Sequence, residues 1–103
     1  MTLRLHPLAE NDLKVALNYY YEISPKLEKR FLSHVEKTFN NILKSPNTYQ
    51  YETKTSQKVL MNKFPYIILY EQYEDFIMIL AIFHTRQHPD KLTKRHNNYE
   101  ETQ

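Results

Sequence analysis

The sequence predicts a single α+β domain in which a helical hairpin lies on one face of an antiparallel sheet. In the first half of the chain, apolar residues recur at spacings of three and four, which is the period of one helix face. The second half instead contains short β-branched and aromatic runs separated by polar breaks, which is typical of strands. A length of 103 residues leaves room for one domain. The expected order of elements is β-α-α-β-β-β.

The first expected element is a short strand, because Leu3, Arg4 and Leu5 alternate apolar and polar and Pro7 ends the segment. A helix from about Leu8 to Glu22 follows. Its apolar face consists of Leu13, Ala16, Leu17 and Tyr20.

A second helix is expected to begin at Ser24 and Pro25. Serine can accept hydrogen bonds from the free amides of a first helical turn, and proline suits the first helical position. The helix then continues to Lys44, about 30 Å at 1.5 Å per residue, and Ser45-Pro46-Asn47 ends it. Its apolar stripe contains Leu27, Phe31, Val35, Phe39 and Ile42. The tight link between the helices predicts that they run antiparallel.

Three strands are expected at Val59–Met61, Tyr66–Tyr70 and Phe76–Phe83. Tyr73, Glu74 and Asp75 would form the turn between the last two strands, although they include no glycine. Because the residues after Leu92 are mostly polar, we expect the domain to occupy residues 1–92 and a polar tail to occupy residues 93–103.

The last predicted strand is apolar on both of its faces. Two helices can cover only one face of a four-stranded sheet, so the other face of Phe76–Phe83 needs a second cover. A partner chain could supply it, since large exposed apolar patches mark interaction sites. The alternative is that the loops and tail of the same chain close this face.

The composition excludes several kinds of site. The chain has no glycine, which the phosphate-binding loops of nucleotide-binding folds and the calcium loop of EF-hands require. It also has no cysteine, so disulfides, thiolate zinc sites and cysteine nucleophiles are excluded. Neither a signal peptide nor a membrane-spanning run is present. We therefore expect a cytoplasmic protein with no membrane contact and no small-molecule cofactor.

Two segments of the second half resemble the RelE/ParE superfamily of type II toxin–antitoxin systems. They are Lys58–Tyr70, which contains Phe-Pro-Tyr, and Ile79–Pro89, which contains His-x-Arg-x-x-Pro. Tyr19-Tyr20 and Ser24-Pro25 are similar to the helical hairpin of the same superfamily, and the resemblance extends over about residues 3 to 92. It implies a toxin that a cognate antitoxin neutralises.

The superfamily contains two unlike activities, and a shared fold does not choose between them. RelE-like members cleave mRNA on the ribosome without a metal ion, whereas ParE-like members inhibit DNA gyrase and are not nucleases. Whether the protein is an enzyme depends on this choice.

If the chain is RelE-like, its catalytic residues are expected among five side chains. The resemblance implies that Arg86 would contact the scissile phosphate, that His84 or His88 would act as base or acid, and that Lys58 and Lys63 would add positive charge. In an extended segment His84, Arg86 and His88 would share one face, about 6.6 Å apart per step. The two histidines would then be about 13 Å apart, which is too far for one metal ion, so no metal site is expected.

The ParE-like or plasmid-stabilisation branch is favoured by the charge and by the helical hairpin. A net charge of +2 is small for a protein that must bind ribosomal RNA through many phosphates. The pattern from Tyr19 to Pro25 also resembles the ParE-like branch. The remaining alternative is a non-toxic module of the same fold that only binds a partner protein.

Overall fold

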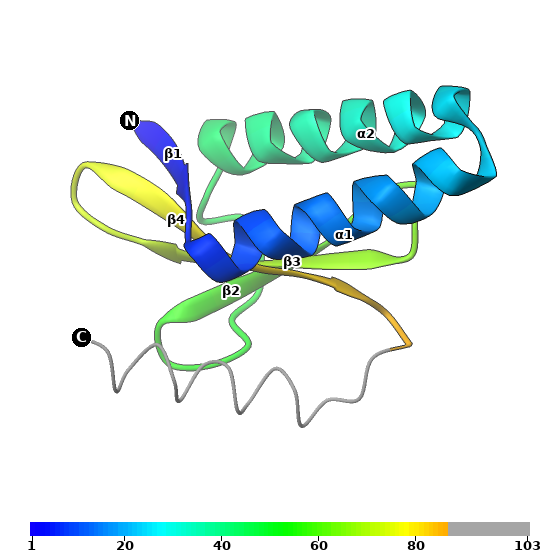
Figure 1. Ribbon diagram of the computed structural model, residues 1–103. Coiled ribbons are helices and arrows are strands. Elements are labelled where there is room, and N and C mark those ends of the chain that lie inside the picture. Colours follow the sequence, from blue (N-terminus) through cyan, green and yellow to red (C-terminus); the bar gives the residue numbers. More distant parts are fainter. Residues whose placement is uncertain (87–103) are drawn as a thin grey trace.

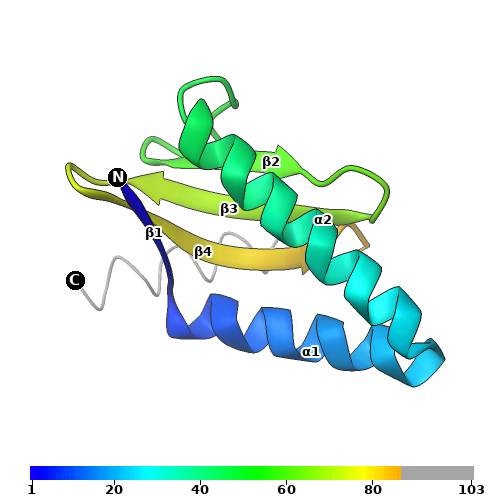
Figure 2. The same cartoon turned by 90° about the horizontal axis from the view of Figure 1, so that it is seen from above.

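The computed structural model describes residues 1–86, and the elements follow the predicted order (Figure 1). Two helices lie together on one face of a four-stranded sheet (Figures 1 and 2). The fold class and the order of elements are therefore confirmed. The elements are β1 (Thr2–Leu5), α1 (Pro7–Ile23), α2 (Pro25–Lys44), β2 (Ser56–Leu60), β3 (Tyr66–Gln72) and β4 (Phe76–His84).

Ser24 joins the two helices as the sequence predicts. Its backbone N–H donates to the carbonyl oxygen of Tyr20 at the end of α1 (2.9 Å), and its hydroxyl accepts from the N–H of Leu27 in α2 (3.3 Å). Because one residue caps both helices, the chain reverses at a single point. The helices diverge from there, and α2 crosses the sheet diagonally while α1 runs beside β4 (Figure 2).

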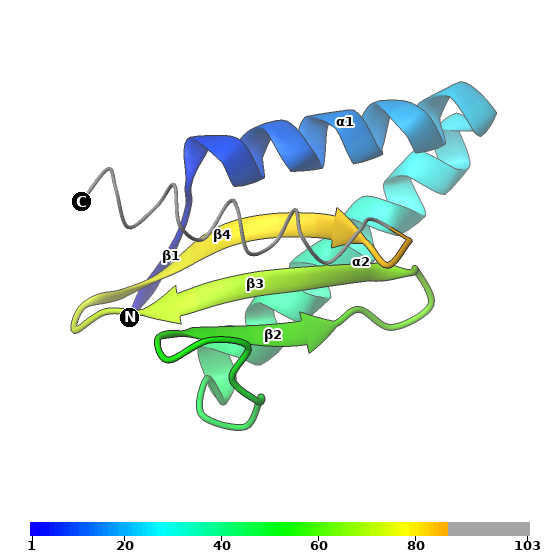
Figure 3. The ribbon, with the colours of Figure 1, turned by 90° about the horizontal axis from the view of Figure 1, so that it is seen from below.

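The sheet has the strand order β1-β4-β3-β2 (Figure 3). β2 is antiparallel to β3 and β3 is antiparallel to β4, whereas β1 is parallel to β4, with Leu3 opposite Ile77. The expectation of an entirely antiparallel sheet is therefore wrong for β1. Parallel strands need a long crossover, and here the two helices and two strands between β1 and β4 provide it.

A β-bulge interrupts β4 where Tyr70 lies opposite Ile79 but Leu69 lies opposite Ala81. The extra residue, Leu80, changes which side chains of β4 face the helices. The predicted turn between β3 and β4 is confirmed, since the N–H of Tyr73 donates to the carbonyl oxygen of Phe76 (2.9 Å).

The main core lies between the helices and the sheet and is rich in aromatic rings. The ring centre of Phe31 in α2 lies 4.8 Å from that of Tyr20 in α1, 5.0 Å from Tyr66 in β3 and 5.1 Å from Phe64. All four rings are buried. Since these rings come from three elements and a loop, their contacts fix the helices on the sheet.

The opposite face of the sheet is also buried. Leu69, Leu80, Ala81 and Phe83 form a second cluster, and none of them is more than 2 % exposed. The burial of these four side chains leaves both expected covers of this face, a partner chain and the loops and tail of the same chain, as predictions.

Candidate functional site

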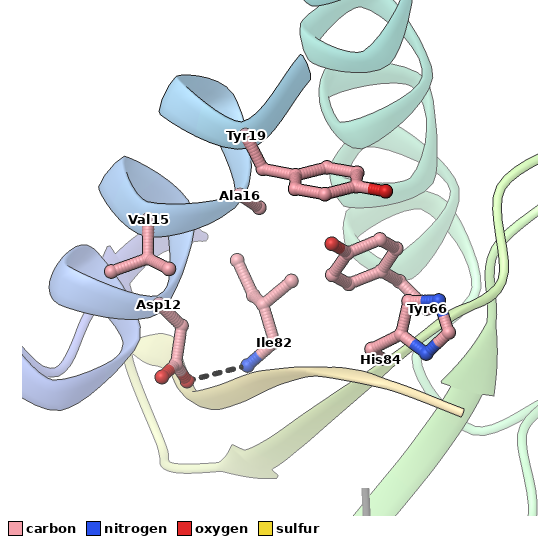
Figure 4. A pocket seen from close by; sticks show the side chains of 7 residues that line it. All are labelled: Asp12, Val15, Ala16, Tyr19, Tyr66, Ile82 and His84. Carbon is pink, nitrogen blue, oxygen red and sulfur yellow. Dashed lines mark hydrogen bonds between the residues drawn. The ribbon is translucent and has the colours of Figure 1, made fainter. Parts of the chain in front are cut away.

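The candidate site is a pocket between α1 and the second half of β4 (Figure 4). Its volume is about 370 Å³, and both polar and apolar side chains line it. The lining residues are Asp12, Val15, Ala16, Tyr19, Tyr66, Ile82 and His84.

The pocket follows from the short length of β1. Leu5, the last residue of β1, lies opposite Ile79, so the rest of β4 has no strand neighbour on that side. α1 lies there instead, and the carboxylate of Asp12 accepts the backbone N–H of Ile82 (2.9 Å). This hydrogen bond fixes the floor of the pocket against the helix.

Two tyrosines give the pocket its aromatic wall. Tyr19 of α1 and Tyr66 of β3 lie on the same side of the pocket, and their hydroxyl groups point in different directions (Figure 4). The imidazole of His84 packs edge-on against Tyr66, with ring centres 5.2 Å apart. Burial raises the pKa of Tyr66 to about 12, and Tyr20 beside it adds to the shift. Tyr66 therefore presents a neutral hydroxyl group at physiological pH.

The outer side of the pocket continues into exposed apolar residues on α1. Val15, Tyr19 and Ile23 follow one another at four-residue spacing, and their side chains are 62, 59 and 59 % exposed. We call these three residues the α1 ridge. Val15 and Tyr19 also line the pocket, so the ridge and the pocket form one continuous surface. Contiguous exposed apolar residues of this kind mark protein interaction sites.

Among the predicted catalytic residues that the structure describes, it separates Lys58 from His84. Lys58 lies opposite Leu69, on the sheet face turned away from the helices, and its amino group pairs with Glu52 (2.9 Å). His84 lies opposite Tyr66, which packs against the helices. Lys58 and His84 therefore face opposite sides of the sheet.

Arg86 does not continue the strand. β4 ends at His84, residues 85–86 form a turn, and the N–H of Arg86 donates to Nδ1 of His84 (3.0 Å). The expectation that His84 and Arg86 share one face of an extended segment is therefore wrong. His88 lies outside the described residues. The loop that carries Lys63 does reach this end of the sheet, since Pro65 accepts the N–H of Thr85 (2.8 Å).

The part of the chain that the structure describes contains no group of three or more metal-ligating side chains. Neither of its helices is both long and apolar enough to cross a membrane.

Sequence reasoning missed Asp12, Val15, Tyr19 and Tyr66 as site residues. One signal was present, because Val15 and Ile23 are apolar residues outside the predicted buried stripe of the first helix. The bond from Asp12 to Ile82 joins residues 70 positions apart, and no local pattern encodes it.

Comparisons with known proteins agree on one family. Residues 3–89 match the model of the ParE toxin of the type II toxin–antitoxin system parDE. The chain is 27 % identical over 89 residues to Toxin ParE2 of two Mycobacterium tuberculosis strains, CDC 1551 / Oshkosh and ATCC 25618 / H37Rv, with 85 % of each chain covered. Its fold is similar to a chain of the chromosomal ParDE TA system from P. aeruginosa, with a TM-score of 0.73 and 17 % identity over 84 % of this chain and 97 % of that one.

Proposed function

Because the chain belongs to the ParE toxins of type II toxin–antitoxin systems, we propose that it arrests growth by inhibiting DNA gyrase and that a cognate antitoxin neutralises it. The family match over residues 3–89 is the observation that carries the proposal. The distribution of the basic residues supports the choice of target.

Cleavage of RNA without a metal ion would need a base, an acid and a cation around one phosphate. Lys58 is paired with Glu52 on one face of the sheet, while His84 lies on the other. This separation removes Lys58 from any site built around His84, which supports a toxin that acts by binding a protein.

We assign the antitoxin to the surface formed by the α1 ridge and the pocket. Val15, Tyr19 and Ile23 are exposed apolar side chains, and the pocket beside them can take an apolar side chain of a partner. A partner that covers this surface would remove it from water and would block access to it by any target. The same surface thus explains both binding and neutralisation.

Two assays with the purified full-length protein test the target. In one, the toxin is incubated with gyrase, ATP and relaxed or supercoiled plasmid, and in the other with ribosomes that translate a defined mRNA. We expect loss of supercoiling or trapped linear DNA in the first assay and intact mRNA in the second. Cleaved mRNA together with unaffected supercoiling would overturn the gyrase proposal in favour of a RelE-like nuclease.

Growth measurements test toxicity and neutralisation. Induced expression of the chain alone should arrest growth, and co-expression with the product of the adjacent gene should restore it. Phe31→Asp, which places a charge in the aromatic core, is the control that should fail to fold and to arrest growth. Normal growth with the wild-type chain at verified soluble expression would support the non-toxic binding module.

A further inference from the structure

The outward face of α2 carries a row of cations that the proposed function does not use. Lys26, Arg30, Lys37 and Lys44 are all exposed and follow one another at spacings of four, seven and seven residues, so they lie on one side of the helix. We call these four residues the α2 basic stripe. At 1.5 Å per residue it is about 27 Å long. α2 lies over the sheet on the side away from the strands (Figure 1), and the side chains of the stripe are exposed.

Helix stability does not account for the stripe. A cation in the first turn of a helix opposes the helix dipole, and Lys26 lies in the first turn of α2. Like charges four residues apart also repel each other. Within the described residues none of the four cations forms a salt bridge, and the single ion pair there joins Lys58 to Glu52. Only Lys44, in the last turn, is placed favourably for the helix.

The exposed residues of α2 beside the stripe are mainly polar or basic. Ser33, Asn40 and Asn41 carry no charge, Lys29 adds a further cation, and Glu36 is the one exposed acidic residue of the helix. The stripe contains no apolar side chain. Protein–protein interfaces have an apolar centre, whereas contacts to a nucleic-acid backbone use arginine, lysine, serine and asparagine.

We propose that the α2 basic stripe binds the phosphate backbone of double-stranded DNA without reading its sequence. The stripe offers charge and hydrogen-bond donors along one side of a helix, which suits contacts to successive phosphates. Binding would therefore be weak and strongly dependent on salt, with a Kd of about 10⁻⁴ to 10⁻⁶ M. The inference goes beyond gyrase inhibition and does not depend on it, because the isolated protein should show it.

Fluorescence anisotropy with a labelled 20-base-pair duplex tests the proposal on the full-length protein. Four phosphate contacts predict a slope of about −3.6 for log K against log salt concentration. The double variant Arg30→Gln/Lys37→Gln should reduce the slope to about −1.8, since each lost contact removes about 0.9. The matched control Lys14→Gln/Lys54→Gln removes two exposed charges outside the stripe and should keep the wild-type slope.

Circular dichroism of both double variants first establishes that they fold as the wild type does. Equal losses in the two variants would overturn the proposal, because DNA binding would then follow the net charge and not the stripe. Wild-type binding by Arg30→Gln/Lys37→Gln would overturn it as well. A second probe, poly-glutamate at matched charge concentration, should bind more weakly than the duplex. Equal or tighter binding of poly-glutamate would assign the stripe to an acidic protein segment and so overturn the choice of DNA.

Discussion

Two polar side chains join segments of the chain that are far apart in sequence. Asp12 of α1 accepts the N–H of Ile82 in β4, and Gln57 of β2 donates to the carbonyl oxygens of Pro46 (2.8 Å) and Tyr49 (2.9 Å). Each bond pairs a backbone group with a side chain from a distant segment. Asp12 thus positions the pocket floor, and Gln57, together with Tyr70, positions the loop after α2.

Asp12→Ala should destabilise the protein by about 1–3 kcal/mol, because the partly buried N–H of Ile82 loses its acceptor. Urea unfolding followed by circular dichroism measures the change. Asp12→Asn keeps a side-chain acceptor and should lose less, and Asn11→Ala, at the exposed neighbouring position, should change little. Equal stability of Asp12→Ala and Asn11→Ala would show that the bond contributes nothing.

Tyr19 is expected to dominate antitoxin binding, because it belongs to both the α1 ridge and the pocket. Tyr19→Ala should weaken binding by at least about 2 kcal/mol, or roughly 30-fold, as aromatic anchors at interface centres do. Isothermal titration calorimetry with the purified antitoxin measures the affinity. The control is Tyr21→Ala, which removes a tyrosine of similar exposure (51 %) on another side of α1. A larger loss for Tyr21→Ala would place the antitoxin elsewhere.

The elements differ in how well the sequence predicts them. α2 has the predicted bounds, and α1 differs by one residue at each end, because helix periodicity and the caps at Ser24 and Pro25 are local signals. β3 and β4 begin where the β-branched and aromatic runs place them and extend one or two residues further, whereas β2 begins three residues before the expected Val59 and ends before Met61. The direction of β1 and the bulge at Leu80 depend on pairing with distant strands, and alternation of polar and apolar residues carries no information about either.

The cap shared by α1 and α2 can be tested separately from the core. Ser24→Ala should cost about 1 kcal/mol, because the N–H of Leu27 loses its acceptor at the start of α2. The midpoint of thermal unfolding measures the effect. Ser33→Ala, at an exposed position inside α2, should be neutral or slightly stabilising because alanine favours helices. If both variants have the same midpoint, the hydroxyl of Ser24 does not stabilise the hairpin.

At the scale of the whole molecule, the sequence predicted the family and fold but not the site. The predicted basic residues were chosen from their order along the chain, but the pairing of β2 with β3 places Lys58 on the sheet face opposite to His84, and the turn at residues 85–86 takes Arg86 out of the strand. The pocket depends on how far β1 extends along β4, which is a property of the complete sheet. A site assembled from one helix and the unpaired part of a strand has no signature in either segment alone.

The pH dependence of unfolding depends on two core tyrosines. Burial raises the pKa of both Tyr66 and Tyr70 to about 12, above the ordinary value of 10, and the hydroxyl of Tyr70 donates to the carbonyl oxygen of Pro46. Between pH 10 and 12 the unfolded chain loses these protons while the folded chain keeps them. Stability should therefore be unaffected by these groups below pH 10 and fall as the pH rises from 10 to 12.

Urea unfolding at several pH values, compared between the wild type and Tyr70→Phe, isolates the contribution of one tyrosine. The variant should lose stability less steeply, by up to about 1.4 kcal/mol per pH unit between pH 10 and 12. Gln57 still donates to Pro46 in the variant, so the loop keeps a hydrogen bond. Parallel curves for the two proteins would contradict a raised pKa at Tyr70.

The parallel pairing of β1 with β4 has a consequence for when the protein becomes complete during its synthesis. Leu3 leaves the ribosome early, but its partner Ile77 is added 74 residues later. The helical hairpin contains mainly local contacts and can form first, whereas the sheet edge and the floor under α1 have to wait for β4. A nascent chain that stops before β4 therefore has no pocket, and translation that aborts early releases no finished toxin.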